Sequence, residues 1–146
     1  MSRLTALECV GLNDLCTLDI ICKTSNDRKR ELEQQDFYGN TALLKACYSG
    51  KLKMVSTLLR FGADVKAVNY YGQNALTLAT YANNLDLIKE LLRWCPYKEF
   101  NKSTLTPAIC VATMFGYWTI QKFYIELDPY HFEDIQTAHV LFTKTK

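Results

Sequence analysis

The sequence predicts an all-α fold, a solenoid of about four short helix-turn-helix units. The first observation is an internal repeat, since the segment 36–50 returns as 69–83 at a shift of 33 residues. The second is the pattern within each copy, where a polar turn precedes small residues and a later pair of leucines. Units of this length and pattern bury a continuous core only by stacking on their neighbours.

The repeat register extends beyond these two segments. Gly50 and Asn83 return as Gly116, and Gly11 is the expected counterpart of Gly50 in the first unit. This spacing gives the first unit about six extra residues, which we place in a solvated polar loop at 25–31. The whole chain, 1–146, is interpreted as a single domain. Its units are expected at approximately 4–35, 36–68, 69–101 and 102–127, followed by a C-terminal cap at 128–146.

Each repeat should open with a projecting turn, a finger, that leads into the first helix. Asp36 begins a four-residue segment that Gly39 closes, and Asn69 and Gly72 do the same one unit later. An Asp or Asn in the first position and a Gly in the last are typical of type I turns. We therefore expect two turns of the same geometry, one repeat apart.

The first helices should begin and end at matching positions. Thr41 and Asn74 each offer a side-chain oxygen to free backbone N–H groups, as does Thr106, which is followed by Pro107 in the first helical position. Left-handed residues that end these helices are expected at Gly50, Asn83 and Gly116. Three first helices are therefore predicted in one register.

The second helix of each unit carries an apolar stripe with helical spacing. Its members are Leu52, Val55, Leu58 and Leu59 in one unit, and Leu85, Ile88, Leu91 and Leu92 in the next. Apolar residues three or four positions apart share one face of a helix. We expect these faces to form the core.

Three runs resemble the ankyrin repeat: DFYGNTAL at 36–43, ACYSG at 46–50 and LLRFGADV at 58–65. The family's Thr-Pro-Leu-His box stands here as TALL at 41–44, NALT at 74–77 and PAIC at 107–110. The box histidine and its hydrogen bonds are therefore expected to be absent, which should lower the stability of the stack. The resemblance implies a non-catalytic protein whose concave face binds a protein partner.

The resemblance also implies which side chains lie on that face. Large amphipathic rings recur there, and such rings often anchor protein interfaces. The candidate partner-binding residues are Phe37, Tyr38, Asn40, Tyr48, Tyr70, Tyr71, Gln73, Tyr81, Met114 and Phe115. In an alternative interpretation, Phe37 and Tyr70 pack one finger against the next, and Met114 and Phe115 fill the last unit.

Composition and motifs argue against other classes of protein. With 49% hydrophobic and 22% charged residues, the chain has no apolar run long enough to cross a bilayer.

The two histidines, His131 and His139, suggest no catalytic set, and we predict neither an enzyme nor a small-molecule substrate, cofactor or metal. Nucleic-acid binding stays a minor alternative, although the net charge is only +2, because of two local basic groups: the run 28–30, and Lys51, Lys53, Arg60 and Lys66.

The six cysteines show no Cys-x-x-Cys spacing, so we expect reduced structural thiols. Cys95 stands in an inter-unit loop, where we allow for exposure. The N-terminal residues do not resemble a secretory signal, which favours a cytoplasmic location, or alternatively a nuclear one.

The last unit is degraded, and two interpretations of the C-terminus stay open. In the first, residues 131–142 fold back as a capping helix that buries Phe132 and Ile135; in the second, the natural chain continues. We predict a non-catalytic adaptor or scaffold that holds a protein partner. A regulatory or anchoring module of a longer multidomain protein is the alternative.

Overall fold

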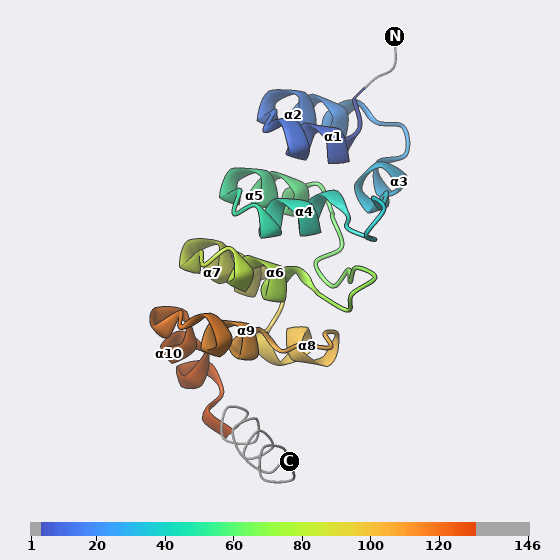
Figure 1. Cartoon of the computed structure of the whole chain (residues 1–146). Helices are drawn as coiled ribbons and strands as arrows, with labels where there is room; N and C mark the ends of the chain where they lie inside the picture. The colour runs from blue at the N-terminus through green and yellow to red at the C-terminus, as the bar shows by residue number, and fades with distance from the viewer. Residues whose placement is uncertain (1–3, 131–146) are drawn as a thin grey trace.

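A computed structural model describes residues 4–130, which form ten α-helices arranged as stacked pairs (Figure 1). The pairs are α1 (Ala6–Leu12) with α2 (Leu15–Thr24), α4 (Ala42–Tyr48) with α5 (Leu52–Arg60), α6 (Ala75–Tyr81) with α7 (Leu85–Trp94), and α9 (Ala108–Phe115) with α10 (Trp118–Leu127). We call them units one to four. Two short helices, α3 (Arg28–Glu33) and α8 (Tyr97–Lys102), lie in the connections. The predicted all-α ankyrin-type solenoid is confirmed.

The two fingers have the predicted turns, which we call finger two (36–39) and finger three (69–72). The Gly39 N–H donates to the Asp36 carbonyl at 3.0 Å, and the Gly72 N–H donates to the Asn69 carbonyl at 3.1 Å. Both glycines have positive φ, and a Cβ on Gly39 would lie 2.6 Å from the ring of Tyr70. Glycine is therefore required here by conformation and by the close approach of finger three.

Two of the three predicted helix caps are present. The Thr41 hydroxyl accepts from the Leu44 N–H at 3.3 Å, and Asn74 Oδ1 accepts from the Thr77 N–H at 3.0 Å. The prediction for Thr106 is wrong, because Pro107 has an extended ψ of 145° and stands before the helix, which begins at Ala108 without a side-chain cap.

The expected left-handed residues are found at Gly50, Asn83 and Gly116. In unit one, however, the left-handed residue is Asn13, whose φ is 58°, and Gly11 lies within α1. The predicted register of unit one is therefore wrong by two positions, because an asparagine provides the helix end that was assigned to a glycine.

A helix replaces the solvated loop that we predicted at 25–31. Asp27 accepts from the Arg30 N–H at 3.1 Å and so caps α3. Leu32 is buried with 1% of its surface exposed, and Glu31 Oε1 accepts from the Ala6 N–H at 2.9 Å. The charged run therefore packs beside the start of α1, and its one leucine anchors it to the core.

The apolar stripes of the second helices face the core as predicted. Val55, Leu58, Ile88 and Leu91 are fully buried, whereas Leu52 and Leu85 at the helix starts are partly buried. The first helices contribute small residues between units, with Ala46 and Ala79 also fully buried. The core therefore runs through all four units.

Helix α8 occupies the connection between units three and four. Its Tyr97 and Phe100 are 6% and 0% exposed, and Cys95 just before it is only 2% exposed. The exposure that we allowed for Cys95 is not observed, because the two aromatic residues bring this connection onto the core. Burial also raises the pKa of the Cys95 thiol.

Three polar contacts hold unit four against unit three. Asn74 Nδ2 donates to the Phe100 carbonyl at 2.7 Å, and the Thr77 hydroxyl donates to the Thr106 carbonyl at 3.0 Å. Thr77 occupies the position of the family's box histidine, so the expected loss of hydrogen bonding at that position is not observed here. In the third contact, the hydroxyls of Thr80 and Tyr124 lie 2.7 Å apart.

Two sequence predictions concern residues outside the described part. These are the C-terminal capping helix at 131–142 and the absence of a catalytic role for His131 and His139. Within residues 4–130, no helix is long and apolar enough to cross a membrane.

We predict that Thr80→Val destabilises the fold more than Tyr124→Phe. The Thr80 hydroxyl donates to the Leu76 carbonyl at 2.8 Å, so its single hydrogen is used and Tyr124 must donate to Thr80. Removing the Thr80 oxygen leaves a buried phenol unpaired, at a cost of about 2 kcal/mol, whereas removing the phenol costs about 1 kcal/mol. Urea unfolding of both variants measures the difference. Equal losses would contradict this assignment of the donor.

Candidate functional site

A groove lies across the junction of units two and three. Its volume is about 490 Å³, and its walls come from the two fingers and from helices α4 and α6. It is lined by Tyr38, Asn40, Tyr48, Asn69, Tyr71, Gln73, Leu78 and Tyr81. We call it the aromatic groove. None of these eight side chains carries a charge.

Two rows of aromatic rings border the groove. In the finger row, Tyr38 stacks on Tyr71 with ring centroids 6.3 Å apart. In the helix row, Tyr81 lies 6.5 Å from Tyr48 and 5.6 Å from Phe115, which itself stacks on Tyr117 at 5.6 Å. The repeat produces the two tyrosine pairs, because residues 33 positions apart occupy the same place in successive units, whereas Phe115 stands one position beyond the counterpart of Tyr81.

Much of this aromatic surface is open to solvent. Tyr48 and Tyr71 are both 63% exposed, and Tyr38 is 52% exposed. Tyr38, Tyr48 and Tyr71 are not part of the core, whereas Tyr81 packs against it with part of its ring. Exposed apolar surface that is contiguous over several residues marks interaction sites more often than scattered residues do.

A network of side-chain amides lies between the rings. Asn69, which is 6% exposed, accepts the N–H groups of Tyr71 and Gln73 through Oδ1, both at 3.0 Å. Its Nδ2 donates to Asn40 Oδ1 at 3.0 Å and to Gln73 Oε1 at 2.9 Å. The network therefore joins finger two to finger three and fixes the orientation of both neighbouring amides.

Six of the ten candidate residues line the aromatic groove: Tyr38, Asn40, Tyr48, Tyr71, Gln73 and Tyr81. Phe115 extends the helix row, and Met114 lies beside it in α9 with 66% of its surface exposed. The remaining two, Phe37 and Tyr70, lie outside the lining. Their role in binding stays a prediction, as does that of the other eight.

Tyr70 takes part in the finger-to-finger contact of the alternative interpretation. Its ring lies over Gly39, and its N–H donates to the Tyr38 carbonyl at 3.0 Å. Phe37 is 89% exposed and meets the edge of Tyr38, with ring centroids 5.6 Å apart. Of the two, only Tyr70 makes the contact between fingers.

Sequence reasoning missed Asn69 and Leu78 as lining residues, and Tyr117 as the end of the helix row. One signal for Asn69 was available in the sequence. The preceding turn has Asp36 at the same position, and an asparagine there adds an N–H₂ group that a carboxylate does not have.

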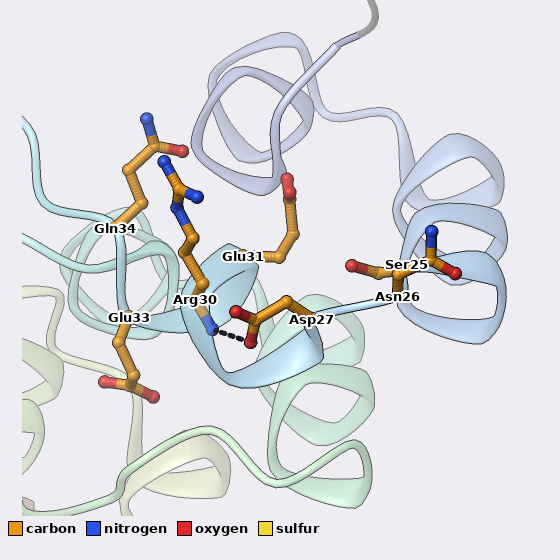
Figure 2. A pocket seen from close by; sticks show the side chains of 7 residues that line it. All are labelled: Ser25, Asn26, Asp27, Arg30, Glu31, Glu33 and Gln34. Carbon is orange, nitrogen blue, oxygen red and sulfur yellow. Dashed lines mark hydrogen bonds between the residues drawn. The ribbon is translucent and has the colours of Figure 1, made fainter.

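A second hollow, of about 720 Å³, lies beside α3 and is wholly polar (Figure 2). Its carboxylates already have partners: Asp27 caps α3, Glu31 accepts from Ala6, and Glu33 Oε1 accepts from the Asp64 N–H at 2.9 Å. These side chains therefore stabilise the structure around α3. Within residues 4–130, no cluster of three or more His, Cys, Asp or Glu could hold a metal ion.

All six cysteines are free, and burial separates them into classes. Cys9, Cys22, Cys47 and Cys95 are buried, Cys110 is half-buried and Cys16 is exposed. Burial raises the pKa of Cys22 to about 11 and also raises the pKa of Cys47. Because the thiolate is the reactive form, the buried thiols are poor nucleophiles.

The stacked helix pairs, projecting turns and groove define an ankyrin-type repeat protein. Residues 6–104 match the family of ankyrin repeats in three copies, and the chain belongs to this family. It is similar to the DNA replication inhibitor plutonium of Drosophila melanogaster, with 50% identity over 142 residues. That similarity covers 97% of this chain and 82% of the relative. Ankyrin repeats are a protein–protein interaction module of a generally non-catalytic family.

We predict that Cys16 reacts with a thiol reagent far faster than any other cysteine of the folded protein. It is the exposed thiol, whereas burial limits access to the others and raises their pKa values. A time course with a chromogenic disulfide reagent, followed by unfolding in urea, measures both classes. Cys16→Ser should remove the fast phase, and a fast phase that persists in this variant would contradict the burial pattern.

Proposed function

We propose that this protein is a non-catalytic adaptor or scaffold, folded as a single domain, that holds a protein partner in the aromatic groove. The observation that carries the proposal is the pair of aromatic rows: the finger row joins units two and three, and the helix row runs from unit two through unit three into unit four. Tyrosine rings combine a large apolar area with few rotatable bonds and a polar tip, and they are enriched among the residues that dominate binding energy.

The relative supports a more specific role. It is named as an inhibitor of DNA replication. By similarity, we propose that this chain acts in the control of DNA replication by binding a protein of that process. Such a role favours a nuclear location for at least some molecules of the protein, in addition to the cytoplasmic location expected from the sequence. If this chain is instead a regulatory module of a longer protein, the same groove would bind its partner.

Direct binding of nucleic acid is a weaker candidate, because three of the basic side chains make contacts within the chain. Arg28 Nε donates to the Cys22 carbonyl at 2.9 Å, and its guanidinium lies over the ring of Phe61. Lys51 donates to the Val10 carbonyl, and Lys66 lies 3.7 Å from Glu99. These contacts disperse the positive charge, whereas phosphate binding needs several free cations on one surface.

We predict that Tyr48→Ala combined with Tyr81→Ala weakens partner binding at least tenfold while the fold stays intact. Truncating central aromatic anchors typically costs about 2 kcal/mol each. The partner is first captured from native cells with the wild-type protein and identified by mass spectrometry. Calorimetric titration against the purified partner then gives the affinity, and thermal unfolding confirms that each variant is folded.

The matched control is Lys53→Ala combined with Asp86→Ala. These exposed residues occupy the same position in α5 and α7, away from the groove lining, and their joint removal leaves the net charge unchanged. This control should bind like the wild type. If the control variant binds more weakly and the tyrosine variant does not, the partner binds to the second helices and the proposal for the aromatic groove is wrong.

A further inference from the structure

The polarity of the groove floor follows from one buried asparagine. Asn69 Oδ1 accepts two backbone N–H groups, so this end of its amide must be the oxygen. The other end is therefore the N–H₂ group, and it must face acceptors. The atoms that it meets on Asn40 and Gln73 are thus their carbonyl oxygens, at 3.0 and 2.9 Å.

The remaining ends of those two amides are consequently N–H₂ groups. Asn40 and Gln73 are half-buried and line the aromatic groove, and their amide nitrogens donate to no atom in residues 4–130. Neither nitrogen is among the buried polar atoms without a partner, so both keep accessible surface, and we infer that they face the groove that the two residues line. The floor between the aromatic rows therefore presents hydrogen-bond donors.

The occupant must supply oxygen acceptors without bringing a charge. A wholly apolar occupant would leave the N–H₂ groups unpaired, which is costly once water is excluded. A phosphate or carboxylate would also accept these bonds, but none of the eight lining side chains is a cation that could compensate its charge. The uncharged acceptor that recurs along any polypeptide is the main-chain carbonyl.

Building on the proposed function, we propose that the aromatic groove binds an extended peptide segment of the partner through its main-chain carbonyl oxygens. The N–H₂ groups of Asn40 and Gln73 donate to these carbonyls, and the tyrosine rows pack against the side chains on either side. In an extended chain the carbonyls and side chains alternate in direction, so one segment offers both kinds of contact.

The test uses linear peptides selected from a phage-displayed library of random dodecapeptides on the wild-type protein. Uncharged peptides are synthesised, and their affinity is measured by fluorescence anisotropy. The informative variant is Asn40→Asp with Gln73→Glu. Each new carboxylate keeps an oxygen toward Asn69 Nδ2 but replaces the groove-facing N–H₂ with a second oxygen. We expect an affinity loss of at least tenfold without loss of the fold.

Asn69→Asp inverts the floor without changing Asn40 or Gln73 themselves. The carboxylate still accepts the two backbone N–H groups, and the amides of Asn40 and Gln73 must then turn to donate to it. Their oxygens would now face the groove, so the affinity should again fall about tenfold. Gln34→Glu adds the same charge at an exposed site outside the groove lining and should leave the affinity unchanged.

The outcomes separate this inference from the proposed function. Suppose that the Tyr48 and Tyr81 double variant loses binding while the substitutions at Asn40, Gln73 and Asn69 have no effect. The groove then binds peptides, but the proposed contact with main-chain carbonyls is wrong. If neither set changes the affinity, the peptides bind elsewhere, which contradicts both.

Replacing single peptide bonds of the selected peptide by esters tests the main chain directly, because an ester carbonyl is a weaker acceptor. The affinity should fall at one or two positions in wild type, and these losses should vanish in the Asn40→Asp, Gln73→Glu variant. If binding instead depends only on a side-chain carbonyl of the peptide, the proposed main-chain recognition is wrong.

Discussion

The close approach of the first helices is the constraint on which the other features depend. A single helix pair cannot bury its apolar face, so each unit needs a neighbour at short distance. Fully buried alanines make this approach possible: Ala42, Ala46, Ala75, Ala79, Ala108 and Ala112. Because the spacing repeats, every side chain at a given position of the repeat meets its counterpart in the next unit. The tyrosine contacts are a direct result.

The units are joined by different polar contacts at different junctions. At the junction of unit three with α8 and unit four, Asn74, Thr77 and Thr80 form hydrogen bonds that are buried or partly buried. Between units two and three, Asn69 joins the fingers at the edge of the open groove. The first set serves packing alone, whereas the second also sets the polarity of an accessible surface.

Much of this arrangement could be predicted from sequence because it follows from a local period. The turns at Asp36 and Asn69, two caps and all four groove-lining tyrosines were found in this way. The failures have a common cause, which is context outside the repeat. The burial of Cys95 and the packing of the helix at 28–33 depend on tertiary neighbours, whereas the end of α1 at Asn13 lies in the unit whose length departs from the repeat. The role of Asn69 was missed because its partners lie partly in another unit.

The position of the aromatic groove links partner binding to the stability of the stacked fold. The groove belongs to neither unit two nor unit three alone, and it exists only while these units remain stacked. Any occupant therefore favours the closed junction, by a free energy that grows with its concentration relative to its Kd. In a stack with mainly neighbour-to-neighbour contacts, the middle junction joins the two halves of the chain. Opening of this junction therefore separates the two halves of the stack and removes the groove at the same time.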